Sequence, residues 1–253
     1  MGTRQTRDVP RRSSTWLSVL ITAALLAAVV AWHPAEQFAA VRRTIGLAGE
    51  RALPAPALRP RGGTFAFVMT QPGSQDPVGW DPCEEIRYSV APAGAPAGGR
   101  ELIDRALARA SSATGLSFDD VGDTEGRPFP EGRRLFGPRE PVVIGWGTAD
   151  EYAELAGDVA GLGGAIAERG GTGRMRFVSG GVVLDVEAFT AAAVVERPQV
   201  MEAIVLHELA HVVGLGHVSE PMELMFANNA GQIDFGIGDL EGLARLGSLP
   251  CGG

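Results

Sequence analysis

The sequence predicts a mixed α/β (α+β) fold, and three segments carry the prediction. In EEIRYSVAP, residues 84–92, apolar side chains alternate with polar ones, which is typical of a half-buried strand. RELIDRALARASSATG, residues 100–115, places its apolar residues at helical spacing, and Gly115 suits a helix end. PVVIGW, residues 141–146, is a continuous apolar run of the kind found in central strands.

The remaining elements follow in chain order. We expect short strands at 64–69, 116–120 and 160–171, one or two strands over 174–189, a helix over 199–214 and a last helix over 239–247. Residues 121–140 are polar and rich in turn residues. Gly180 and Gly181 are expected to interrupt the strand region. Pro198 favours a helix start, because proline is well suited to the first helical position.

An apolar run, TWLSVLITAALLAAVVAW, covers residues 15–32 and contains no charge. As a helix it would span roughly 27 Å, close to the thickness of a membrane's hydrocarbon core. Four arginines precede it, which keeps residues 1–14 in the cytoplasm and sends the rest of the chain outside. The run is either a transmembrane anchor or a cleaved signal peptide, with Val29-Val30-Ala31 as a weak cleavage site. Arg11-Arg12 fits a twin-arginine signal poorly.

Residues 33–63 are predicted to be a linker between this leader and the folded domain. LPAPALRPRGG, residues 53–63, is rich in proline and glycine and has no helical period. A short helix near 35–48 is a candidate element. The domain itself is expected to cover residues 64–253.

Charge is distributed unevenly along the chain. All 22 basic residues are arginine, and the net charge is −8. Residues 1–62 carry +6, whereas the remainder carries −14. An acidic domain argues against a nucleic-acid partner. It suits a soluble extracellular domain, which we expect to be a monomer. Some of its carboxylates are candidate ligands for calcium.

The only two cysteines are Cys83 and Cys251, and no C-x-x-C motif is present. Exported domains meet an oxidising environment, and the termini of a domain often lie close together. The sequence therefore predicts a Cys83–Cys251 disulfide, with two free thiols as the alternative.

HELAHVVGLGH, residues 207–217, holds three of the four histidines of the chain. Residues four apart share one face of a helix, so His207 and His211 can bind one metal ion. Glu208 flanks that ion as a general base without being a ligand. A catalytic zinc has three protein ligands and an open position. Gly214 can end the helix at a positive φ and turn the chain, so that His217 becomes the third ligand.

Two other interpretations of the motif are weaker. In the first, the histidines belong to an ordinary core helix and are hydrogen-bonded within the protein. However, a chance match to all five motif residues (His, Glu, His, Gly and His) is expected in about one of 100,000 such chains. The second is a structural zinc module. Such sites usually have four protein ligands, and no cysteine or fourth histidine is nearby in the sequence.

The pattern H-E-x-x-H-x-x-G-x-x-H resembles the signature of the metzincin metallopeptidases. Met225 in MELMF, with a leucine before it, is similar to the methionine turn of the matrixin branch. The closing GDLEGLARLG and the order of Trp80, a strand and a helix also resemble a matrixin domain. The resemblance covers about residues 78–253, and only 207–225 is highly specific.

The resemblance implies a twisted, mostly parallel five-stranded sheet with helices, an active-site helix and a small C-terminal subdomain. Met225 would support one catalytic zinc from below, and the strand near 163–168 would be an edge strand that pairs with a peptide or protein substrate. The implied function is a zinc-dependent endopeptidase in which Glu208 takes a proton from a zinc-bound water. The alternative is a surface-anchored binding protein with little turnover, although a binder has no need of Glu208.

Three departures from the matrixin pattern stand out. Residues 64–206 contain no histidine, so a second, structural zinc cannot be built in the usual way. Phe226-Ala227 follows the methionine where matrixins have a proline at the second place. No PRCG-type cysteine switch is present, and residues 33–63 are short for a propeptide, so latency through a cysteine ligand is not expected, with Cys83 as the alternative.

Overall fold

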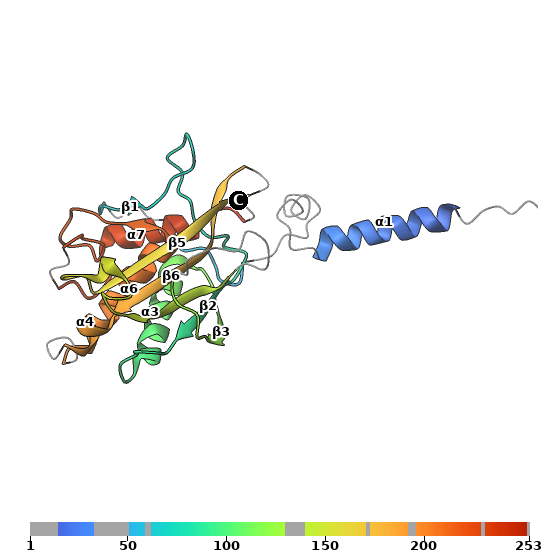
Figure 1. The fold of residues 1–253 in the computed structure, drawn as a ribbon. Helices are drawn as coiled ribbons and strands as arrows, with labels where there is room; N and C mark the ends of the chain where they lie inside the picture. The colour runs from blue at the N-terminus through green and yellow to red at the C-terminus, as the bar shows by residue number, and fades with distance from the viewer. Residues whose placement is uncertain are drawn as a thin grey trace, which may run out of the picture. The chain divides into compact units, whose positions relative to one another are not determined.

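The structure is a computed structural model that describes residues 15–32, 51–58, 62–129, 140–170, 173–191, 196–228 and 231–251. The chain divides into two compact units, residues 1–48 and 49–253. In the first unit, helix α1 covers Thr15–Trp32, the bounds that the sequence predicts (Figure 1). Over the described residues, no helix is long and apolar enough to cross a membrane. The anchor and the cleaved signal both stay predictions, and the candidate helix near 35–48 lies outside the described residues.

The second unit is built on a five-stranded sheet with the order β3-β2-β4-β6-β5. Its strands are β2 (Ile86–Ala91), β3 (Phe118–Asp123), β4 (Val142–Gly147), β5 (Gly161–Arg169) and β6 (Met175–Asp185). Neighbouring strands are parallel except β5, which pairs antiparallel with β6 at one edge. This confirms the mixed α/β class and the mostly parallel sheet of five strands.

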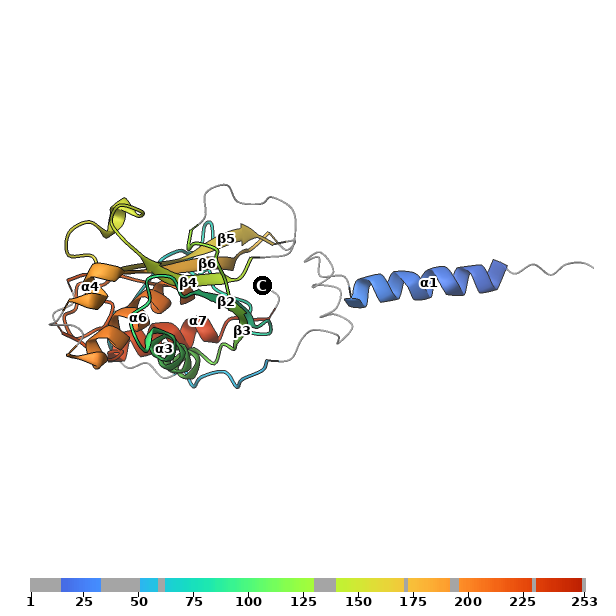
Figure 2. The ribbon, with the colours of Figure 1, turned by 60° about the horizontal axis from the view of Figure 1, so that its bottom comes forward.

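Three helices cover one face of this sheet. They are α3 (Gly99–Thr114), α6 (Pro198–Val213) and α7 (Ile237–Gly247), and Figure 2 shows them together below the strands. The predicted helices at 100–115, 199–214 and 239–247 are thus confirmed to within a few residues. A 3-10 turn, η2 (Ala153–Leu155), precedes β5.

The region 174–189 differs from the prediction in two ways. β6 is one continuous strand of 11 residues, so Gly180 and Gly181 do not interrupt it. Both glycines pair with β5 or β4 inside the sheet, and this pairing outweighs their local preference for turns. Residues 186–189 belong to a short helix, α4 (Val186–Thr190), instead of a strand. The Asp185 carboxylate caps it by accepting a hydrogen bond from Ala188 N at 2.8 Å.

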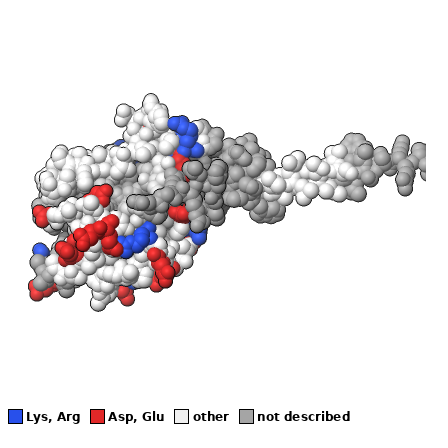
Figure 3. All heavy atoms as spheres, viewed as in Figure 1, with Lys and Arg blue, Asp and Glu red and all other residues white. Residues whose placement is uncertain are grey.

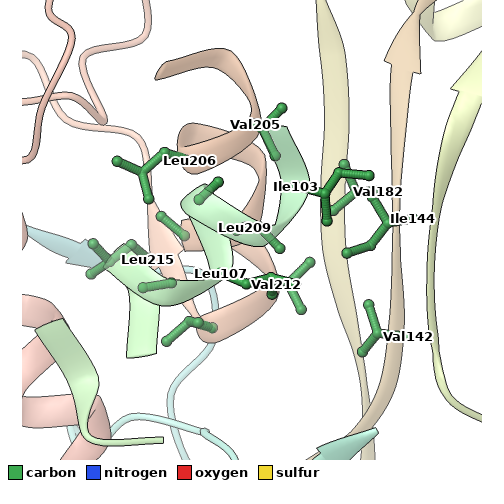
Figure 4. Packing of buried hydrophobic residues seen from close by; sticks show 14 of the residues in the cluster. Ile103, Leu107, Val142, Ile144, Val182, Val205, Leu206, Leu209, Val212 and Leu215 are labelled. Atoms are coloured by element: carbon green, nitrogen blue, oxygen red, sulfur yellow. The ribbon is translucent and has the colours of Figure 1, made fainter. Parts of the chain in front are cut away.

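The core lies among helices α3, α6 and α7 and the sheet. Val205, Leu209 and Val212 on α6 face Ile144 and Val182 on the strands (Figure 4), and each of these five residues is at most 1% exposed. Full burial stabilises each such side chain by roughly 1.5–3 kcal/mol. α6 is therefore fixed against the sheet by apolar residues that stand before and between the motif residues in the sequence.

A short segment before the main sheet packs against the end of α6. β1 (Ala66–Phe67) is only two residues long and pairs antiparallel with β7 (Leu215–Gly216). Val68 N also donates to Gly214 O at 2.9 Å. We call residues 63–68 the N-terminal strap.

Cys83 and Cys251 form a disulfide, as predicted, with their Cα atoms 5.4 Å apart. The bond joins the loop before β2 to the tail after α7. The alternative of two free thiols is therefore wrong for this structure.

Candidate metal centre

Three histidine nitrogens converge at the end of α6. His207 and His211 project from successive turns of the helix, and His217 approaches from the chain beyond it. The Nε2 atom of His217 lies 3.1 Å from Nε2 of His207 and 3.1 Å from Nε2 of His211. The three residues predicted as ligands are thus brought together by the fold, within reach of one metal ion.

The outer nitrogens of two of these rings are held by main-chain carbonyls. His207 Nδ1 lies 2.8 Å from Leu224 O, and His211 Nδ1 lies 2.7 Å from Leu215 O. A carbonyl oxygen only accepts hydrogen bonds, so Nδ1 carries the proton in both rings. Both Nε2 atoms therefore direct a lone pair toward His217.

This donor set fits zinc. Neutral imidazole nitrogens are ordinary zinc ligands, and a tetrahedral ion with a Zn–N distance of about 2.0–2.1 Å places two ligand nitrogens slightly more than 3 Å apart. Hydrogen bonds from the second ring nitrogen to a carbonyl are the usual means of orienting such ligands.

The histidines are neutral at physiological pH. Burial lowers the pKa of both His207 and His211 to about 4, and it also lowers the pKa of His217. A neutral ring keeps the lone pair that a metal requires, so no proton has to be displaced from these nitrogens at pH 7.

Gly214 ends α6 as the sequence predicts. Its φ is +129°, a value that favours glycine, and its N–H donates to Ala210 O at 2.9 Å. A Cβ atom here would lie 3.1 Å from side-chain carbons of both Phe177 and Leu246. The turn toward His217 therefore needs glycine for both its conformation and its packing.

Glu208 lies beneath the edge strand β5. Burial raises the pKa of its carboxyl to about 8, although a hydrogen bond from the Gly163 main chain acts in the opposite direction. A Cβ atom on Gly161 would come within 2.9 Å of Glu208 Cγ, and one on Gly163 would overlap the Glu208 main chain. The two glycines thus let β5 approach α6 closely. The sequence shows these glycines, but their function was not predicted.

Met225 belongs to the loop that orients His207. Its side chain is buried, and its carbonyl accepts a hydrogen bond from Val218 N at 2.9 Å. The preceding residue, Leu224, supplies the carbonyl bound to His207. Phe226 and Ala227 continue the loop, and Ala227 N donates to Val218 O at 3.3 Å.

Two buried carboxylates that the sequence does not single out fix this loop to α7. Glu223 accepts hydrogen bonds from Gly238 N and Asp239 N, each at 2.9 Å. Asp239 accepts from Leu224 N at 2.5 Å and from Gly236 N at 3.0 Å. Both acids accept hydrogen bonds from N–H groups at or near the start of a helix, which have no partner within the helix. A buried acid in a loop has no periodic signal in the sequence, so Glu223 could not be predicted.

Other candidate ligands give no second centre in the described part of the chain. The one further group of clustered donors is Asp81, Cys83 and Cys251, whose sulfurs form the disulfide. No cluster of three carboxylates is found among the described residues, and calcium binding stays a prediction. On the face shown in Figure 3, acidic side chains cover more of the surface than basic ones, in keeping with the net charge of −8.

No protein-family model matches the sequence, and no curated protein matches it.

Proposed function

We propose that this chain is a zinc-dependent endopeptidase of the metzincin type, similar to the matrixins. One observation carries the proposal: His207 and His211 direct unprotonated Nε2 atoms at His217, with 3.1 Å between the nitrogens. Orienting carbonyls, a helix-ending glycine and an adjacent buried glutamate are the features that this chemistry requires.

His207, His211 and His217 would hold the ion. Bound there, zinc would polarise water and a peptide carbonyl, and its charge would favour the ionised form of the Glu208 carboxyl. Glu208 would accept the proton that the attacking water loses, and would return it to the amine nitrogen as the peptide C–N bond breaks. Its burial under β5 limits its hydration and keeps the carboxyl in one place. The orienting carbonyls of Leu215 and Leu224 hold the histidine rings while the proton moves.

β5 is the element best suited to receive a peptide substrate. It lies at the edge of the sheet, and its inner side packs on α6 at Glu208. An edge strand offers unpaired main-chain groups, to which an extended peptide can add as a further strand. The peptide bond would then lie beside the motif.

The proposed compartment is outside the cytoplasmic membrane. The disulfide supports this weakly, because such bonds persist mainly in oxidising environments. The basic residues before 15–32 predict the same orientation for either an anchor or a signal peptide.

A paired metal and activity measurement tests the function. We expect the purified chain to bind one zinc and to cleave peptides in a library, with a chelator abolishing the cleavage. His211→Ala should lose most of the metal, whereas His33→Ala, the control outside the cluster, should keep it. Two tightly bound zinc ions per chain, or equal zinc in both variants, would contradict the assigned centre.

Glu208→Gln separates an enzyme from a binding protein. Glutamine preserves the shape and the acceptor for Gly163 but cannot take up a proton, so we expect zinc to be retained and the rate to fall by roughly 10²–10⁴-fold. Near-normal hydrolysis by this variant would contradict the assignment of Glu208 as the general base. A wild-type chain that binds zinc and peptides without cleaving them would establish the binding protein instead.

A further inference from the structure

We infer that Trp80 is a positioning residue for the metal centre, because it holds the last turn of α6 through its indole N–H. The inference rests on the proposed function. Trp80 precedes β2 and lies 127 positions before His207 in the chain. Its Nε1 donates to Val212 O at 2.8 Å, and both residues are buried.

The Val212 carbonyl is one that the helix cannot satisfy alone. The last four carbonyls of an α-helix have no partner within the helix. Val212 directly follows the ligand His211 and stands two residues before Gly214, where the chain turns toward His217. Holding this carbonyl therefore fixes the direction in which the chain leaves α6.

The loop that carries Trp80 is itself fixed. Phe177 N on β6 donates to Gly79 O at 3.0 Å, and the rings of Trp80 and Phe177 lie 6.2 Å apart. The same Phe177 ring packs against Gly214. On the other side, Cys83 binds the loop to the tail through the disulfide. The sheet and the disulfide thus hold the indole in place against the turn.

Loss of the indole N–H would leave the Val212 carbonyl buried without a partner. The free energy of such a group falls if the last turn opens and the carbonyl accepts a hydrogen bond from another donor. Opening would shift Gly214 and, with it, the Nε2 atom of His217. The metal requires three nitrogens at fixed distances, so this shift weakens binding more than it weakens the rest of the fold.

The chain offers a matched control. Among the described side chains, the indole N–H of Trp146 on β4 is buried without a hydrogen-bond partner. Trp146→Phe and Trp80→Phe both remove one buried indole, yet only the second removes a hydrogen bond. The general cost of removing a buried indole appears in both variants.

Both variants are to be made in the full-length chain. Zinc affinity is measured by competition with a chelator below the unfolding temperature, and coordination by the absorption spectrum of the Co²⁺ form. We expect Trp80→Phe to weaken zinc by about tenfold and to alter the Co²⁺ spectrum. Trp146→Phe should leave both unchanged. Equal zinc affinity and equal spectra in the two variants would overturn the inference, even if Trp80→Phe unfolds at a lower temperature.

A metal-free measurement separates this inference from the proposed function. The ¹⁵N spectrum of the histidine rings should show the His217 signals moved or broadened in Trp80→Phe and unmoved in Trp146→Phe. If the wild-type chain bound no zinc, the proposed function would be wrong. The histidine signals of the metal-free protein would still show whether Trp80 positions His217. If Trp80→Phe does not fold, 3-benzothienylalanine at position 80 keeps the bicyclic ring and removes only the N–H, with the same expected result.

Discussion

Two main-chain oxygens determine how the histidine rings lie. Leu215 O and Leu224 O each hold one Nδ1 atom, so both rings are oriented by backbone and not by side chains. A backbone acceptor is present whatever the residue, and therefore the sequence motif cannot reveal it. The ligands themselves could be predicted, because their spacing alone places two of them on one helical face.

Asp239 makes the stability of the domain depend on pH. Burial raises the pKa of its carboxyl to about 6, and the nearby Glu223 acts in the same direction. The folded state thus holds this proton at pH values where the unfolded state has released it. The stabilisation is complete below pH about 4 and is lost as the pH rises through about 6.

Asp239→Asn tests this dependence, because asparagine resembles the protonated acid in shape. Unfolding of the metal-free protein by urea is to be measured between pH 4 and 7. We expect the wild type to lose up to about 3 kcal/mol relative to the variant across this range. Asp150→Asn, at an exposed position, should instead follow the wild type. Parallel curves for the wild type and Asp239→Asn would show that the proton is not held there.

At the scale of elements, the contact between β5 and α6 positions Glu208. Gly161→Ala would press a methyl group against the Glu208 side chain, whereas Gly164→Ala on the same strand meets only the Phe129 ring at 3.8 Å. We expect Gly161→Ala to lower kcat by about 100-fold with zinc retained, because small displacements of a catalytic group have effects of that size. Gly164→Ala should keep most of the activity. Equal rates in the two variants would show that Glu208 tolerates the displacement.

Local sequence patterns correctly predicted the helices and strands whose apolar residues follow a single helical or strand pattern. The apolar stripe of α3, the alternation of β2 and the run of β4 each lie within a few residues of the expected bounds. Gly180 and Gly181 do not interrupt β6, because pairing within the sheet, with β5 for Gly180 and with both β4 and β5 for Gly181, overrides a local preference for turns. The pairing of β1 with β7 joins residues about 150 apart in the chain, a contact that no short window of sequence contains.

For the whole molecule, the disulfide is the main covalent constraint. It joins residues 168 apart, so reducing it frees a long loop in the unfolded chain. We expect the double variant Cys83→Ser, Cys251→Ser to lose up to about 5 kcal/mol of unfolding free energy. Urea denaturation of the reduced wild type should give the same curve as the variant. A variant with the midpoint of the oxidised wild type would show that the bond adds no stability.

The fold class, the disulfide and the candidate ligands could all be predicted from the sequence, whereas the parts that orient them could not. His207, His211 and His217 stand in a specific spacing. Of the groups that orient them, Trp80 comes from a distant segment, and Glu223 lies six residues after His217 in a loop without a periodic pattern. Their contacts with the candidate site can be identified only from the folded structure.

The N-terminal strap limits where a maturation cut can fall. Val68 is bonded to Gly214 beside the metal-ligand turn, and Gly63 lies against the Glu223 carboxylate. A cut after residue 69 would leave the sheet and the disulfide intact, yet it would free the segment that backs this turn. If the domain is cleaved from the residues before it, a cut ahead of Gly63 leaves this segment in place. The contacts that back this turn thus begin more than 20 residues ahead of the first strand of the main sheet.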